Sequence, residues 1–223
     1  LEILYLEVGG TETSYVLTRN KLFTFSGILK EFEDWRNKTN KADCLQGDEY
    51  LNNLSLGLST TPHYKNFQAS NVKDIPLSIK TEERPVLTVF TSSLWEFYSF
   101  EDYDDSPEDF KDAYRLYTNI ATDEYLLDKY KIIFRWHPNL VRAGNSEKER
   151  ITEVVNNSNS KVIHFLPNSD VNSYKLLQRS DVVVTVGSTI CLEATYHQKP
   201  SILLGKSQFS NTGIAYEPNS YHE

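Results

Sequence analysis

Short runs of apolar, often β-branched residues recur from residue 86 onward and predict buried strands. The runs cover residues 86–90, 131–136, 161–165, 182–186 and 201–204. They lack the alternation of apolar and polar residues, which is typical of parallel strands that are covered on both faces. Segments with helical spacing separate them, at residues 106–121, 123–129, 147–156, 172–179 and 190–197. This order predicts an α/β fold with a doubly wound parallel sheet.

The chain before this region is less regular. Apolar runs that fit either strands or chain crossing a surface lie at 1–6, 15–17 and 22–25. A short amphipathic helix is predicted over 32–37, with an earlier start near 27–28 as the alternative. Residues 38–74 are polar and irregular, with a helix start at 48–51 left open. We therefore expect a partial, irregular N-terminal region over 1–80 and a sheet domain over 81–223. The chain begins at Leu1 and contains no methionine, so we expect either a piece of a longer protein or an edited sequence.

The turn after one predicted strand has the residues of an anion-binding site. Gly187, Ser188 and Thr189 follow the run at 182–186 and open a helix. Glycine lets the backbone approach a ligand closely, and hydroxyl and N–H groups at a helix start favour a phosphate. Glu193 lies four residues after Thr189, so its carboxylate falls on the same helix face. An ordinary Ser/Thr cap with a glutamate that suits the helix dipole explains the pattern equally well.

Polar residues also follow two other predicted strands. Ser92 and Ser93 come after the run at 86–90, and Arg135, His137 and Pro138 lie at the end of the run at 131–136. Ligands of doubly wound sheets bind beyond the carboxyl ends of the strands, so we expect all these residues at one edge. Serine hydroxyls can hold a phosphate, and a histidine or arginine can neutralise its negative charge. A helix cap for the serines and a loop cap for His137 are the alternatives.

Composition narrows the classes of function. The chain has 223 residues, 39% of them hydrophobic, and a net charge of -8, so it fits a globular protein and not a non-specific nucleic-acid binder, which needs basic surface. No apolar run reaches the roughly 18 residues of a membrane span, so no integral membrane segment is predicted. Cys44 and Cys191 lie far apart, and no metal-ligand cluster occurs. We expect a reducing cytoplasm and no bound metal.

The sequences RWHPN at 135–139 and VGSTICLEATYHQKPSILLG at 186–205 resemble a known family. They are similar to the nucleotide-binding half of GT-B glycosyltransferases, and more narrowly to capsule and lipopolysaccharide biosynthesis proteins such as Kdo transferases and bacterial sialyltransferases. The resemblance covers residues 84–222 and implies a Rossmann-like, C-terminal GT-B domain. It implies that His137 with Pro138 and Ser188 with Thr189 contact the nucleotide phosphate, and that Glu193 holds the ribose or base. The family's general base comes from an N-terminal domain that is not recognisable in this chain, so no catalytic residue is named.

These features lead to two hypotheses of different classes. The first is a transferase of bacterial capsule or lipopolysaccharide synthesis, which passes a sugar from a nucleotide-activated donor to a glycan acceptor. The resemblance favours a CMP-sugar donor, leaves a UDP-sugar open and implies no obligatory cofactor. We expect a cytoplasmic enzyme, with peripheral association with a membrane assembly complex left open. The second hypothesis is a non-catalytic module that binds a nucleotide or polysaccharide beside a partner transferase. A nucleotide-sugar epimerase is a further enzyme alternative.

Overall fold

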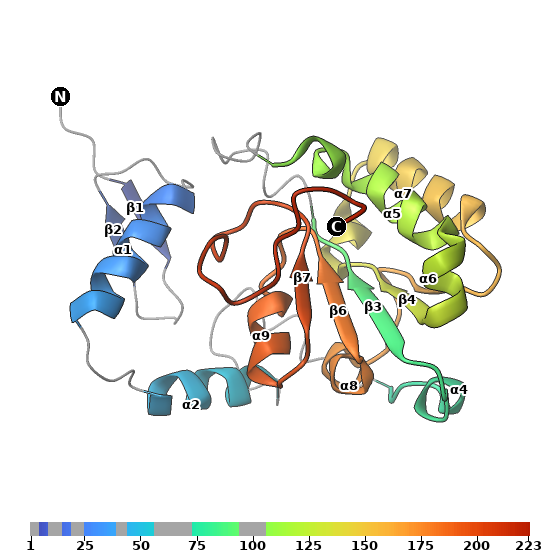
Figure 1. The fold of residues 1–223 in the computed structure, drawn as a ribbon, viewed down its shortest axis with the longest axis horizontal. Helices are drawn as coiled ribbons and strands as arrows, with labels where there is room; N and C mark the ends of the chain where they lie inside the picture. Colours follow the sequence, from blue (N-terminus) through green and yellow to red (C-terminus); the bar gives the residue numbers. More distant parts are fainter. Residues whose placement is uncertain (1–4, 9–14, 19–24, 39–43, 56–72, 94–105) are drawn as a thin grey trace.

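A parallel β-sheet forms the centre of the protein (Figure 1). The computed structural model describes residues 5–8, 15–18, 25–38, 44–55, 73–93 and 106–223. The sheet consists of β3 (Val86–Phe90), β4 (Lys131–Arg135), β5 (Ile163–Phe165), β6 (Val182–Thr185) and β7 (Ser201–Leu203). Their order is β5-β4-β3-β6-β7, and all neighbouring pairs are parallel. Each strand lies within one of the predicted apolar runs, and the α/β, Rossmann-like fold is confirmed.

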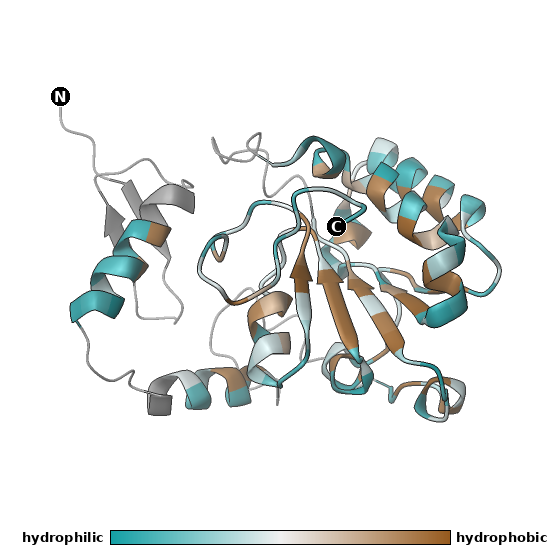
Figure 2. Cartoon of the chain, in the orientation of Figure 1, coloured by the Kyte–Doolittle hydropathy of each residue, from teal (hydrophilic) through white to brown (hydrophobic). Residues whose placement is uncertain are grey.

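Helices cover both faces of the sheet. One face carries α5 (Ala113–Thr122), α6 (Glu124–Lys129) and α7 (Asn145–Asn157). The other face carries α4 (Leu77–Lys80), α8 (Ser173–Arg179) and α9 (Ile190–Tyr196). A 3-10 helix, η4 (Pro138–Arg142), follows β4. Figure 2 shows hydrophobic residues along the strands and mixed character along the helices. In β3, Leu87 packs in the core on the α5–α7 face, and Val86 packs in the core on the α4, α8 and α9 face. Successive side chains of a strand point to opposite faces of the sheet.

The helix predicted over 106–121 begins later than its sequence suggests. Pro107 precedes only a short 3-10 turn, η3 (Glu108–Phe110). Helix α5 begins after Asp112, whose Oδ1 accepts a hydrogen bond from the N–H of Tyr114 at 3.0 Å. The prediction of one continuous helix is wrong here, because the aspartate side chain caps the helix at a later position.

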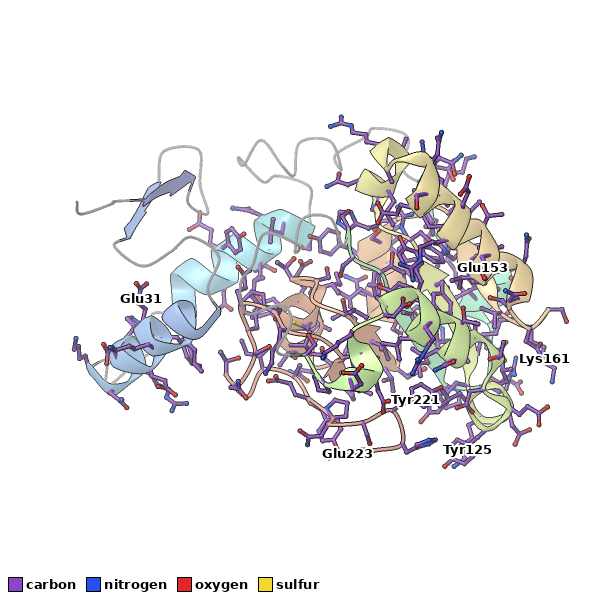
Figure 3. All side chains as sticks on the ribbon, turned by 90° about the horizontal axis from the view of Figure 1, so that it is seen from above. Glu31, Tyr125, Glu153, Lys161, Tyr221 and Glu223 are labelled. Carbon is purple, nitrogen blue, oxygen red and sulfur yellow. The ribbon has the colours of Figure 1, made fainter. Side chains whose placement is uncertain are left out.

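The N-terminal elements lie beyond α9 at one end of the molecule (Figure 1). They are an antiparallel pair, β1 (Tyr5–Val8) and β2 (Tyr15–Thr18), followed by α1 (Phe25–Lys38) and α2 (Cys44–Ser55). Helix α1 is longer than the predicted helix over 32–37 and begins close to the alternative start at 27–28. Helix α2 lies in the stretch expected to be largely irregular and includes the helix start left open at 48–51. The runs at 1–6 and 22–25 fall largely outside the described residues. Figure 3 shows Glu31 of α1 at the opposite end of the molecule from Lys161.

Residues 73–80 pack with the sheet, although the predicted boundary assigns them to the N-terminal region. Ile75 and Ile79 are buried in the core on the α8 side of the sheet. Lys73 forms a parallel bridge with Val171, just before α8. We therefore propose that the sheet domain includes residues 73–80.

Candidate functional site

Three strand ends meet at the point where the strand order reverses. From β3 the chain builds β4 and β5 on one side and then returns to build β6 and β7 on the other. In the register, Phe90 pairs with Arg135 of β4 and with Thr185 of β6. The following segments therefore leave the sheet at one edge: 91–93, 136–139 and 186–189. In doubly wound folds this edge borders the crevice where ligands bind.

Trp136 anchors the segment that carries His137. Its side chain is fully buried and stacks on Phe134, with ring centroids 6.1 Å apart. Its indole N–H donates a hydrogen bond to Nδ1 of His164 at 3.2 Å, which satisfies the buried donor. Packing and this hydrogen bond together fix the backbone just before His137. Trp136 is therefore a core residue.

His137 is held at its backbone and at one ring nitrogen. Its N–H donates to Oγ1 of Thr91 at 2.9 Å. Its Nδ1 accepts a hydrogen bond from the N–H of Asn139 at 3.2 Å and lies 3.0 Å from Oγ of Ser93. Because Nδ1 is an acceptor, the neutral ring carries its proton on Nε2. Pro138 occupies the first position of η4, where a backbone N–H is not needed.

The imidazole of His137 is neutral at pH 7. Burial and the nearby charge of Arg135 lower its pKa to about 4. The ring therefore acts as a hydrogen-bond donor through Nε2 and supplies no positive charge. The sequence suggests that a histidine or an arginine at this strand end neutralises a phosphate, and of the two Arg135 is the residue that keeps its charge at pH 7.

The guanidinium of Arg135 is buried, and it is used within the protein. Nε donates to Oγ of Ser173 at 3.0 Å. Nη1 donates to the carbonyl oxygens of Trp136 at 3.1 Å and Leu166 at 3.0 Å, and Nη2 lies 3.5 Å from the carbonyl oxygen of Ser169. Burial lowers the pKa of Arg135 to about 10, so the group remains charged at pH 7. Arg135 lies at the candidate edge, where it joins neighbouring segments to each other.

The turn after β6 combines a special backbone position with a helix cap. Gly187 has a φ of 134°, which residues with a side chain rarely adopt. The N–H of Ser188 donates to Oγ1 of Thr185 at 3.2 Å, and Oγ of Ser188 accepts from the N–H of Ile190 at 3.3 Å. Ser188 thus accepts the N–H of the first residue of α9 from one position before the N-cap residue, Thr189, and its hydroxyl retains a hydrogen that can be donated. Thr189 makes no cap bond of this kind.

Glu193 places a buried carboxyl group beside this turn. Its exposed fraction is 5%. Tyr174 of α8 and Thr189 hydrogen-bond the carboxyl group, and Oε2 has no partner among the described residues. Burial raises the pKa of Glu193 to about 7, and the two hydrogen bonds limit that rise. A buried acceptor without a partner is costly, so Oε2 is a candidate to accept a hydrogen bond from a ligand.

The two serines after β3 differ in their surroundings. Ser93 is buried and contacts His137, as described above. Ser92 is also buried, and within the described segments its hydroxyl has no hydrogen-bond partner. The helix that this pair would cap falls on residues 94–105, which lie outside the described part of the chain.

Some residues that build the edge carry only a weak sequence signal. Thr91 and Asn139 flank the predicted residues and act through a hydroxyl and a backbone N–H. Tyr174 follows Asn172, the N-cap of α8, whose side chain accepts from the N–H of Lys175 at 3.0 Å. The predicted helix at 172–179 begins at the same edge of the sheet, so a residue of its first turn, such as Tyr174, could have been identified from the sequence.

Other kinds of site find no support in the residues that the structure describes. Among them, no group of three or more His, Cys, Asp or Glu side chains is placed to hold a metal ion. None of the helices in these segments has the length and apolar character to cross a bilayer. Cys191 is buried, and burial raises the pKa of its thiol to about 12, which disfavours a thiolate nucleophile.

Comparison with known proteins adds a family match and similar folds. Residues 121–223 match a family model described as "Capsule polysaccharide biosynthesis protein". The Thermosulfurimonas dismutans KpsC beta Kdo 2,4 transferase has a TM-score of 0.61 and 14% identity, covering 98% of this chain and 66% of that one. The beta Kdo 2,7 transferase of the same KpsC has a TM-score of 0.56 and 12% identity, covering 99% and 63%. No curated protein sequence matches the chain.

The chain spans less than two thirds of the length of either transferase structure. At these identities the structural likeness shows a shared fold. The family match covers the segments after β4 and β6, which carry His137 and Ser188. The C-terminal part of the chain is thus similar to capsule polysaccharide biosynthesis proteins.

Proposed function

We propose that the protein binds a nucleotide-activated sugar at the strand-end edge and acts as a glycosyltransferase, or as the donor-binding part of one, in bacterial capsule or lipopolysaccharide synthesis. The observation that carries this proposal is the neutral His137, fixed beside Ser93 at the switch point of the sheet. The match of residues 121–223 to capsule biosynthesis proteins supports the sugar-transfer class. The fold shared with two Kdo transferases agrees with it.

In this proposal the leaving nucleotide is held by hydrogen bonds. Nε2 of His137 and the hydroxyl of Ser188 donate to phosphate oxygens, Thr189 contacts the phosphate through its backbone N–H, and Gly187 lets the backbone approach them. As the bond at the anomeric carbon breaks, negative charge develops on the phosphate and these hydrogen bonds strengthen. Oε2 of Glu193 accepts a hydrogen bond from the ribose or base. We assign no catalytic base.

A CMP-sugar is the donor that this edge suits best, with a UDP-sugar as the alternative. A nucleoside monophosphate carries less charge than a diphosphate and needs fewer cations. The described part of the edge offers neutral donors, because His137 is uncharged at pH 7 and the charge of Arg135 is buried against protein carbonyl groups. Neither an obligatory metal nor another cofactor is part of the proposal.

Isothermal titration calorimetry with CMP, CDP, UDP and GDP tests the proposal. We expect CMP to bind most tightly. We expect His137→Ala to weaken CMP binding about tenfold or more while the circular dichroism spectrum stays native, since one hydrogen bond to a charged phosphate is lost. If none of the four nucleotides binds at millimolar concentration to a chain that unfolds cooperatively, the proposal is rejected.

The second candidate is a donor-binding module without turnover. The length of the chain supports this candidate, because the chain spans only 66% and 63% of the two transferase structures. Incubation with a CMP-sugar and a glycan acceptor separates the two candidates. Release of CMP with transfer of sugar supports an enzyme, whereas binding without release supports the module. A cytoplasmic location and peripheral association with a membrane assembly complex remain predictions.

A further inference from the structure

We propose that Arg135 is a positioning residue, which fixes His137 and the turn after β5 and does not itself bind the nucleotide. The inference rests on the proposed function, because it concerns how the nucleotide site is held in shape. Its starting point is the burial of the guanidinium, with an exposed fraction of 5% for the residue. A charged group at this depth requires compensating hydrogen bonds, and their partners indicate its role.

The first partner is the peptide group that leads into His137. Nη1 of Arg135 donates to the carbonyl oxygen of Trp136 at 3.1 Å. The N–H on the other side of the same peptide, that of His137, donates to Oγ1 of Thr91 at 2.9 Å. The Trp136–His137 peptide is therefore held at both ends, and Arg135 supplies one of the two contacts. Rotation of this peptide group would change the orientation of the His137 imidazole.

The other partners lie on the turn after β5 and on α8. Nη1 donates to the carbonyl oxygen of Leu166 at 3.0 Å, and Nη2 lies 3.5 Å from that of Ser169. The N–H of Ser169 donates to the carbonyl oxygen of Leu166 at 2.9 Å, so both acceptors belong to one turn. Nε donates to Ser173, the first residue of α8, at 3.0 Å. The next residue, Tyr174, hydrogen-bonds Glu193.

These contacts occupy most of the donors of the guanidinium. Arginine has five N–H groups in a rigid planar fork, and four contacts to protein acceptors already engage Nε, Nη1 and Nη2. Lysine keeps the charge but cannot reproduce a fork that reaches several segments at once. Replacing Arg135 with lysine therefore removes the positioning contacts and keeps the positive charge.

A double-mutant cycle between Arg135→Lys and His137→Ala separates positioning from direct binding, with the Kd for CMP as the readout. If Arg135 acts through His137, Arg135→Lys weakens binding about tenfold in the otherwise unchanged chain and by no more than about threefold in the His137→Ala chain. Equal weakening in both backgrounds indicates a direct contact and overturns the proposal. Arg142→Lys, at an exposed arginine of η4, is the matched control and is expected to leave the Kd unchanged.

The ring signals of His137 in ¹⁵N NMR spectra of the ligand-free chain give a readout that does not depend on nucleotide binding. We expect one set of signals with the proton on Nε2 in the unchanged chain and broadened or split signals in Arg135→Lys. Unchanged signals in a folded Arg135→Lys chain overturn the proposal. If no nucleotide binds to the unchanged chain, the proposed function fails, and this measurement still decides the role of Arg135. If Arg135→Lys does not fold, Ser173→Ala replaces it, with the same expected broadening and the same overturning result.

Discussion

The hydroxyl of Ser93 lies 3.0 Å from Nδ1 of His137, and the N–H of Asn139 donates to the same nitrogen. The first contact joins the end of β3 to the segment after β4 across a sequence separation of 44 residues. Together they fix the tautomer and the orientation of the imidazole, because an acceptor at Nδ1 leaves the proton on Nε2. The candidate site therefore depends on a contact between two strand ends, and no single motif defines it.

Replacement of Ser93 by alanine is expected to weaken CMP binding by about three- to tenfold. The effect is smaller than that expected for loss of His137 itself, because Asn139 still holds Nδ1. Calorimetric titration measures the Kd, and Ser146→Ala, at an exposed position of α7, is the control. An unchanged Kd in Ser93→Ala would contradict a role for the serine in orienting the histidine.

The buried carboxyl group of Glu193 is expected to make stability fall as pH rises. Burial raises its pKa from an ordinary value of 4.5 to about 7. The protonated form is favoured in the folded state, so its stabilising contribution is complete below about pH 4.5 and is lost as pH rises through about 7. Glutamine does not ionise, so Glu193→Gln removes this loss. The unfolding free energy of the variant minus that of the wild type should be larger at about pH 8 than at about pH 5, by up to about 3 kcal/mol.

Urea unfolding of the wild-type and Glu193→Gln chains at a series of pH values tests this prediction. The difference in unfolding free energy between the two chains is expected to grow in favour of the glutamine variant between about pH 4.5 and 7 and to level off above about pH 7. A difference that stays constant across this range would show that the carboxyl group is already ionised in the folded protein. Glu149→Gln, on the exposed side of α7, is the control for a simple change of charge.

Protonation of His164 is expected to lower the stability of the chain as pH falls. Its Nδ1 accepts from the indole N–H of Trp136, and its Nε2 lies 2.9 Å from Oγ of Ser158. Burial lowers its pKa from an ordinary value of 6.5 to about 4. The neutral form is favoured in the folded state, so its contribution is complete above about pH 6.5 and is lost as pH falls toward about 4.

Replacement of His164 by glutamine should therefore flatten the fall in stability between about pH 6.5 and 4, whatever its effect at neutral pH. The measurement is the slope of unfolding free energy against pH, compared with that of His222→Gln at an exposed position. His137 also has a lowered pKa and should contribute to the remaining slope, together with carboxyl groups whose pKa values ion pairs lower, such as those of Asp74 and Asp170. An unchanged slope in His164→Gln would assign the acid sensitivity to other groups.

The strands could be predicted from the sequence because burial on both faces demands apolar residues at successive positions. Val182, Val183 and Val184 leave no polar face, and they lie in β6, an interior strand between β3 and β7. The start of α5 could not be predicted in the same way. Ser106 with Pro107 and Asp112 are both good cap sequences, and only the packing of the helix on the sheet decides between them.

The candidate site was harder to predict than the fold. Local rules identify the turn at Gly187 and the pair of residues at His137, because they follow apolar runs directly. They do not reveal that Arg135 faces protein carbonyl groups or that Tyr174 reaches Glu193 from a different helix. Such contacts depend on the order and register of parallel strands, which the sequence of each strand does not encode.

Gly205 is expected to be essential for the position of the turn after β6. A Cβ atom at this residue would lie 2.9 Å from the carbonyl oxygen and 3.0 Å from Cγ1 of Val186. The closest atom belongs to the backbone, so alanine must displace the end of β6 just before Gly187. Gly205→Ala should destabilise the chain by about 1–3 kcal/mol and also weaken CMP binding. Gly144→Ala, with no atom within 4 Å of its Cβ position and a φ of -65°, is the control and should change neither. Urea unfolding and calorimetric titration measure the two effects, and destabilisation with an unchanged Kd would separate the turn after β6 from the nucleotide site.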